Sequence, residues 1–110
     1  MRILLVSCVR NEGPFLLEWL AHHRAAGVSD FLLFSNDCED GTDAMLDALA
    51  AAGLVTHVRN RYGETGRAAQ WQALADAWQH PLRAAADWIM AIDCDEFVNI
   101  RAPHDTLAGL

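Results

Sequence analysis

Residues 88–97 read WIMAIDCDEF, an apolar run that ends in three carboxylates within four positions. We expect a buried strand over residues 88–92 that brings Asp93 and Asp95 to one edge of a sheet, because two acids one residue apart on an extended chain point to the same side. Like charges held this close repel each other unless a positive ion lies between them. The stretch therefore indicates a site for a divalent cation, either Mn²⁺ or Mg²⁺, which would in turn hold phosphate oxygens.

Three more apolar runs of strand length precede this stretch, and amphipathic segments of helical length separate them. We expect strands at residues 3–9, 30–35 and 54–58. We expect helices at residues 13–26, 42–52 and 67–79, with a short helical piece at 82–86. Strands that are apolar almost throughout, alternating with helices, predict an α/β fold with three α/β/α layers and a mostly parallel, Rossmann-like sheet.

One apolar stripe on each of the three longer helices is expected to pack against the sheet. The stripes consist of Phe15, Leu16, Trp19, Leu20 and His23; of Met45, Leu46, Leu49 and Ala52; and of Trp71, Leu74, Ala75 and Trp78. We interpret Trp71 and Trp78 as core residues and not as a platform for a sugar ring. Asp40 or Thr42 is expected to cap the second helix. His57 and His104 have no evident acidic partner in the sequence, so neither is a candidate catalytic residue.

The length of 110 residues and a hydrophobic content of 53% predict one domain, residues 1–110, with a sizeable core. The net charge of −7 argues against nucleic-acid binding, which needs a basic patch. All eight basic residues are arginines. The absence of lysine excludes the lysine-dependent phosphate loop and a lysine Schiff base.

The three cysteines, Cys8, Cys38 and Cys94, show no C-x-x-C spacing and cannot all pair with one another. The apolar run after Met1 is too short for the core of a signal peptide, and no run reaches the roughly 20 residues of a membrane span. We therefore expect a reduced, cytoplasmic protein.

Polar residues follow each predicted strand, where ligands of parallel α/β sheets bind. Arg10, Asn11 and Glu12 follow the first strand; Asn36, Asp37 and Asp40 the second; Asn60, Arg61 and Tyr62 the third; Asp93, Asp95 and Glu96 the fourth. Acids gather after the second and fourth strands and arginines after the first and third. This mixture suits a ligand that carries hydroxyl groups, phosphates and a bound cation.

The segment from Asp93 to Phe97 resembles the D-x-D element of nucleotide-sugar glycosyltransferases with the GT-A fold. Residues 9–12, VRNE, with the Leu- and Trp-rich segment after them, resemble the opening of family 2-like members, and residues 36–42, NDCEDGT, resemble their acidic loop. Gln70, upstream of residues 87–88, fits the D-x-D-E-F subgroup. The resemblance covers residues 1 to about 100 and implies the nucleotide-binding half of a GT-A fold.

This resemblance implies a role for each matching position. The backbone of Val9, Arg10 and Asn11 would hold the base, and Asp37 would meet the base or the ribose. Asp93 and Asp95 would face the ribose and the Mn²⁺ or Mg²⁺ that bridges the diphosphate, with Gln70 as a further nucleotide-sugar contact. Arg10 and Arg67 are candidate phosphate contacts.

Family members usually continue well past D-x-D with a half that binds the acceptor and supplies the catalytic base. This chain ends about 14 residues after Glu96, so we expect a domain truncated after the D-x-D motif. It would bind a nucleoside-diphosphate sugar and, when complete, transfer the sugar to an unknown acceptor. The alternatives are a non-catalytic interaction module that keeps the fold and, with less support, a metal-dependent phosphatase. An incomplete sheet would leave an open edge, which predicts a twofold homodimer.

Overall fold

The computed structural model describes all residues except 12, 37–40, 61–65, 67, 95 and 98–110. Its elements are β1 (Ile3–Val9), α1 (Gly13–Ala25), β2 (Asp30–Ser35), α2 (Thr42–Ala51), β3 (Thr56–Arg59), α4 (Ala69–Gln79), α5 (Pro81–Ala85) and β4 (Trp88–Ala91). The bounds of β1 and β2 are those expected from the sequence. The other strands and helices lie where they were expected, with ends that differ by one or two residues.

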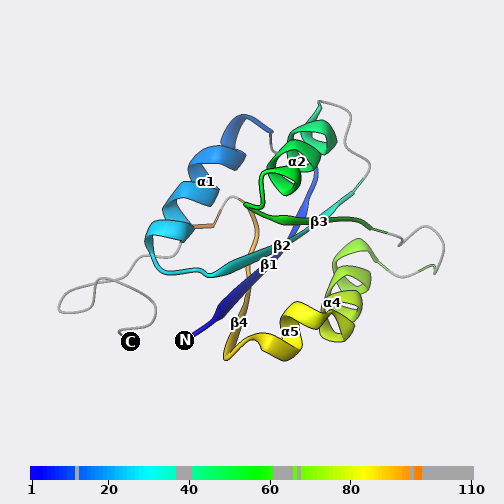
Figure 1. Ribbon diagram of the computed structural model, residues 1–110. Coiled ribbons are helices and arrows are strands. Elements are labelled where there is room, and N and C mark those ends of the chain that lie inside the picture. Colours follow the sequence, from blue (N-terminus) through cyan, green and yellow to red (C-terminus); the bar gives the residue numbers. More distant parts are fainter. Residues whose placement is uncertain (12, 37–40, 61–65, 67, 95, 98–110) are drawn as a thin grey trace.

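The four strands form one parallel sheet in the order β3-β2-β1-β4. Helices α1 and α2 lie on one face of this sheet, and α4 and α5 lie on the other (Figure 1). The chain therefore builds the sheet outward from β1 to β3 and then crosses back to place β4 on the other side of β1. The prediction of an α/β fold with a parallel, Rossmann-like sheet is confirmed.

Two apolar clusters fill the spaces above and below the sheet, because successive strand residues point to opposite faces. Ile3, Leu5 and Val9 of β1 belong to the cluster under α1 and α2, together with Leu16 and Trp19. The opposite cluster lies under α4 and consists of Leu4, Val6, Leu32, Phe34, Ala73 and Ala77. Both faces of β1 and β2 are thus buried, which explains why these strands are apolar at almost every position.

Helix α4 packs on the sheet through a different side from the one expected. Its buried residues are Gln72, Ala73 and Ala77, whereas Trp71 is 72% exposed and Trp78 is 58% exposed. The interpretation of Trp71 and Trp78 as core residues is wrong. Two of the three buried residues, Ala73 and Ala77, have small side chains, and the indole rings of Trp71 and Trp78 lie on the exposed side of the helix.

The expectation that β4 is a buried strand is also wrong. Trp88 is 64% exposed and Ile89 is 41% exposed, and no strand among the described residues pairs with β4 on the side away from β1. The apolar sequence predicted burial on both faces, but β4 lies at an edge of the described sheet.

Two smaller expectations about α1 and α2 also change. Phe15 is 60% exposed, although the rest of its stripe is buried. Residue Gly41 occupies the N-cap position of α2 with φ 88°, without a side-chain cap. The hydroxyl of buried Thr42 instead accepts a hydrogen bond from the backbone N–H of Gly13 at 3.1 Å, which ties the starts of the two helices together.

None of the helices in the described part of the chain is both long and apolar enough to cross a membrane.

Candidate functional site

A narrow hollow lies beside the carboxyl ends of β1 and β4, next to the start of α4. Its lining includes Ser7 and Cys8 from β1, Gln70 from α4, and Ile92 and Asp93 after β4. The strand order reverses between β1 and β4, and this is the place where ligands bind in open α/β sheets. The hollow itself holds only about 20 Å³, close to the space of one water molecule. A larger ligand would therefore lie across its mouth, where Gln70 and Asp93 are exposed.

The turn that carries Asp93 is held by hydrogen bonds within the turn and from α1. The N–H of Asp93 donates to Oε1 of Glu96 at 2.8 Å, and the N–H of Glu96 donates to the carbonyl of Asp93 at 3.0 Å. The indole N–H of Trp19 donates to the carbonyls of Asp93 at 3.2 Å and of Glu96 at 3.0 Å. We call the described residues Asp93, Cys94 and Glu96 the acid turn.

The residues after β1 present backbone and polar side chains at the same edge. Val9 is fully buried, and its carbonyl accepts a hydrogen bond from the N–H of Asn36 at 2.8 Å. Arg10 and Asn11 are exposed beyond it. Asn11 has φ 52°, a left-handed conformation that asparagine tolerates better than most residues. The chain thus leaves the sheet abruptly after Val9.

Two asparagines connect the ends of β2 and β3 to α4. The side-chain amide of Asn60 donates to Oδ1 of Asn36 and to the carbonyl of Ala69, both at 2.8 Å. Burial raises the pKa of the Cys8 thiol, a hydrogen bond with Asn36 opposes this shift, and the negative charge of Asp93 adds to it. The thiol is therefore mostly protonated at neutral pH, and Cys8 and Asp93 are close enough to influence each other.

His57 has an acidic partner, contrary to the expectation from the sequence. Its Nδ1 donates to Oδ1 of Asp47 at 2.7 Å, and its Nε2 lies 2.8 Å from Oγ of Ser35. Ser35 is only 4% exposed, so this serine-histidine-aspartate row has no access for a substrate. The hydrogen bond from His57 lowers the pKa of Asp47, and Arg59, whose Nη2 lies 3.0 Å from Oδ2 of Asp47, lowers it further. The network joins α2 to β2 and β3.

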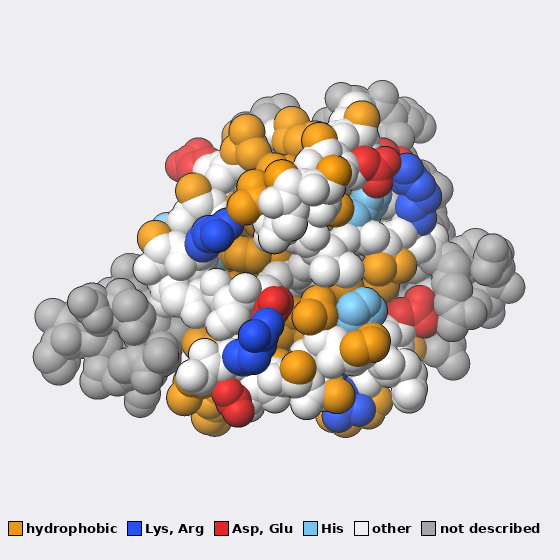
Figure 2. Space-filling model, viewed as in Figure 1, with side chains coloured by type: hydrophobic (Ala, Val, Ile, Leu, Met, Phe, Trp, Pro, Cys, Tyr) orange, Lys and Arg blue, Asp and Glu red, His pale blue; other side chains and the backbone are white. Residues whose placement is uncertain are grey.

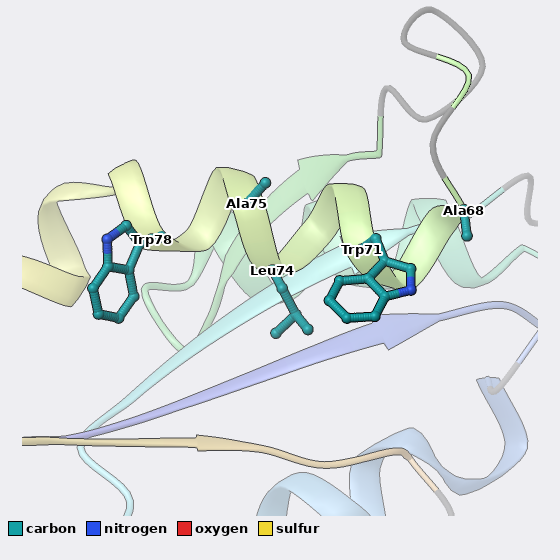
Figure 3. A pocket seen from close by; sticks show the side chains of 5 residues that line it. All are labelled: Ala68, Trp71, Leu74, Ala75 and Trp78. Atoms are coloured by element: carbon teal, nitrogen blue, oxygen red, sulfur yellow. The ribbon is translucent and has the colours of Figure 1, made fainter.

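A wider groove lies on the exposed side of α4. Its volume is about 690 Å³, and Ala68, Trp71, Leu74, Ala75 and Trp78 line it. Trp71, Leu74 and Trp78 point from the helix towards the side on which β1 and β4 run (Figure 3). An adjoining groove of about 230 Å³ shares Leu74 and Trp78 and reaches Ile89 of β4. These grooves are apolar, so the candidate site for a charged ligand is the smaller hollow at Asp93.

On the face seen in Figure 2, the charged side chains are scattered, and some of the basic ones lie beside acidic ones. One such ion pair joins Arg2 to Asp30 at 2.8 Å, and Arg59 also lies 3.2 Å from Asp43.

The structure brings together only part of the site expected from the sequence. Gln70 and Asp93 line the same hollow, and Val9, Arg10 and Asn11 lie at the end of the neighbouring strand. Asp37, Arg67 and Asp95 lie outside the described residues. No group of three or more potential metal ligands occurs among the residues that are described, and Asp93 is the described member of the expected metal pair.

The sequence analysis predicted Trp19 only as part of the apolar stripe of the first helix and did not predict its role at this site. Trp19 is indeed fully buried, but a buried indole N–H needs an acceptor. This need for an acceptor was the feature of the sequence that could have indicated a second role for Trp19. The acceptors lie 74 and 77 residues further along the chain, so only the fold could identify them.

Comparison with known proteins gives one family. The sequence model of the family described as Glycosyltransferase family 92 matches residues 5–109. A glycosyltransferase family 92 protein of Ricinus communis is 26% identical over 100 residues, which cover 87% of this chain and 17% of that protein. Another, of Oryza sativa subsp. japonica, is 30% identical over 97 residues, which cover 84% of this chain and 15% of that protein. The chain thus spans about a sixth of the length of these curated relatives. No solved structure matches it significantly.

Proposed function

The chain belongs to glycosyltransferase family 92, and we propose that it forms the part of a glycosyltransferase that binds the nucleoside diphosphate of a sugar donor through Mn²⁺ or Mg²⁺. The resemblance to glycosyltransferases is confirmed at the level of the family. The proposal includes a GT-A fold, a likeness to family 2-like members and a D-x-D role for Asp93 and Asp95.

The observation that carries the proposal is the position of Gln70 and Asp93. Both line one hollow between the carboxyl ends of β1 and β4, where the strand order reverses. Asp93 is exposed there, and carboxylate oxygens are the ligands that Mn²⁺ and Mg²⁺ accept. A donor lying over this edge would also meet the exposed backbone after Val9.

The chemistry of the proposed site is electrostatic. A bound divalent ion would offset the charge that develops on the departing nucleoside diphosphate. Asp93, with Asp95, would hold this ion. The backbone of Val9, Arg10 and Asn11 would hold the base, and Asp37 would contact the base or the ribose. Gln70 would contact the donor across the mouth of the hollow.

The acceptor and the catalytic base are not assigned to this chain, which spans about a sixth of its relatives' length. We expect the chain alone to bind donor and metal without transferring sugar. A turnover assay with sugar donors and candidate acceptors checks this expectation, because metal-dependent sugar transfer by the chain alone would refute it.

The test of donor binding is calorimetric titration of the chain with a panel of nucleoside diphosphates, with and without Mn²⁺. We expect binding that depends on the metal and is lost or strongly weakened in Asp93→Asn, which keeps the size of the side chain and removes its charge. The control is Glu18→Gln, because Glu18 is exposed on α1 and does not line the hollow.

If no nucleoside diphosphate binds with or without the metal, the alternative of a non-catalytic interaction module is favoured. If Asp93→Asn binds as tightly as the wild type, the assignment of the metal to this edge is wrong.

A further inference from the structure

We propose that Trp19 and Glu96 are positioning residues that fix the acid turn, so that Asp93 is presented in one orientation to a divalent cation. This inference rests on the proposed function for its consequence, and on the hydrogen bonds of the turn for its geometry. It assigns to Glu96 a role as a partner of the backbone and not as a metal ligand.

The first contact comes from the helix on the far side of the turn. Trp19 is fully buried on α1, and its single indole N–H is shared between the carbonyls of Asp93 and Glu96 at 3.2 and 3.0 Å. These two carbonyls mark the beginning and the end of the turn. One rigid donor therefore fixes the spacing of both ends, and the ring that carries it is itself held by the core.

The second contact is made inside the turn by Glu96. Its Oε1 accepts the N–H of Asp93 at 2.8 Å, while its own N–H donates to the carbonyl of Asp93 at 3.0 Å. In this reciprocal pair the carboxylate of Glu96 is bonded to the backbone N–H of Asp93. Glu96 therefore restrains the backbone of Asp93, the residue that we propose as a metal ligand.

A third contact anchors the residue that follows the turn. The ring of Phe97 stacks on His23 with centroids 5.9 Å apart and meets His22 edge-on at 5.0 Å. His23 in turn lies 4.9 Å from Trp19, and its Nδ1 is 2.9 Å from the carbonyl of Trp19. The same side of α1 therefore contacts both the acid turn and Phe97, the residue that follows it.

The consequence concerns metal affinity. Partners that orient a metal ligand typically change affinity about 10- to 100-fold when they are removed. Asp93 is exposed at the end of an edge strand, so the sheet alone does not restrain its backbone on both sides. We expect the hydrogen bonds of Trp19 and Glu96 to supply that restraint.

The first experiment measures hydrogen exchange of the indole N–H groups by NMR. The chain has four tryptophans, and Trp71, Trp78 and Trp88 are all more than half exposed. We expect the Trp19 indole proton to exchange far more slowly than the other three. Exchange as fast as theirs would overturn the proposal.

The second experiment titrates Mn²⁺ alone and follows free Mn²⁺ by electron paramagnetic resonance. Trp19→Phe keeps a buried ring but removes the donor, and we expect Mn²⁺ affinity to fall about 10- to 100-fold. The control is Phe31→Leu, which alters a buried ring 6.1 Å from Trp19 that has no hydrogen-bond donor for the turn. Equal losses in the two variants would show a general loss of structure and would contradict the proposal.

A third comparison separates a positioning role for Glu96 from a role as a ligand. Glu96→Gln keeps an oxygen that can accept the N–H of Asp93, whereas Glu96→Ala does not. We expect Gln to preserve most of the Mn²⁺ affinity and Ala to lose it. If Gln is as damaging as Ala, Glu96 binds the metal and its assignment as a positioning residue is wrong.

The proposal and the proposed function fail in different ways. If the wild type binds no Mn²⁺, the metal site is refuted, and hydrogen exchange still decides whether the turn is clamped. In that case Trp19→Phe should speed exchange at the N–H of Glu96, while Phe31→Leu should not. Unchanged exchange in Trp19→Phe would overturn the clamp.

Discussion

Asp47 shows how a single exposed carboxylate acquires a defined role from its neighbours. It accepts from the buried ring of His57 and lies 3.0 Å from the guanidinium of Arg59. The hydrogen bond from His57 is the largest cause that holds the pKa of Asp47 below its ordinary value of 3.8. Because the pKa is depressed in the folded chain, the stabilising contribution is present above the unfolded pKa and is lost as the pH falls through the folded pKa.

The corresponding prediction is that Asp47→Asn lowers the free energy of unfolding near pH 6 but has little effect at the acidic end, below the folded pKa of Asp47. The substitution removes the charge that the His57 and Arg59 contacts stabilise. Urea unfolding at several pH values measures the difference between variant and wild type. Glu18→Gln serves as the control, and a difference for Asp47→Asn that does not shrink with acidification would contradict the prediction.

At the scale of elements, α4 shows that side-chain volume selects the face that meets the sheet. Ala73 is 1% exposed and Ala77 is 5% exposed, and both belong to the cluster that contains Leu4 and Phe34. The larger residues on the other side line an open apolar groove (Figure 3). Hydrophobicity alone predicted the reverse arrangement.

We therefore expect Ala77→Leu to destabilise the fold by about 1–3 kcal/mol, because the added atoms must enter a packed interface. Ala75→Leu places the same substitution on the groove side of the same helix and should change stability by no more than about 0.5 kcal/mol. Chemical denaturation of both variants measures the effect. Equal costs for the two would show that α4 does not pack as described.

At the scale of the whole molecule, the edge of the described sheet formed by β4 is more exposed than the edge formed by β3. β4 pairs only with β1 among the described strands, and both Trp88 and Ile89 are exposed on it. Ile89 lines a groove together with Trp78, whereas Trp88, the next residue along the strand, points to the other face of the sheet. An edge strand with unpaired backbone groups is a template for pairing with another strand. The same edge on two copies can pair around a twofold axis.

The homodimer expected from the sequence thus stays a prediction, now placed at β4 and the groove. Sedimentation velocity should show a concentration-dependent shift from monomer to dimer, which the double variant Trp78→Gln/Trp88→Gln weakens. Phe15→Gln, an equally exposed aromatic position on α1, should leave the association unchanged. A monomer at every concentration would contradict the prediction.

Periodicity and turn chemistry in the sequence determined the order of the elements and the class of fold. The apolar runs that form β1 and β2 are buried on both faces, so their composition predicted their bounds directly. The acids after β4 and the polar residues after β1 indicated the edge at which we place the proposed site. These features are local, and a local pattern is enough to predict them.

Only the tertiary structure decided which apolar residues are buried, which side of α4 meets the sheet, and which strands lie at the edges of the described sheet. It also decided that Trp19 holds the acid turn and that His57 meets Asp47, because each contact joins segments that the sequence separates. The physical reason is that packing depends on the shape and volume of neighbouring elements, whereas periodicity records only the hydrophobicity of one element at a time.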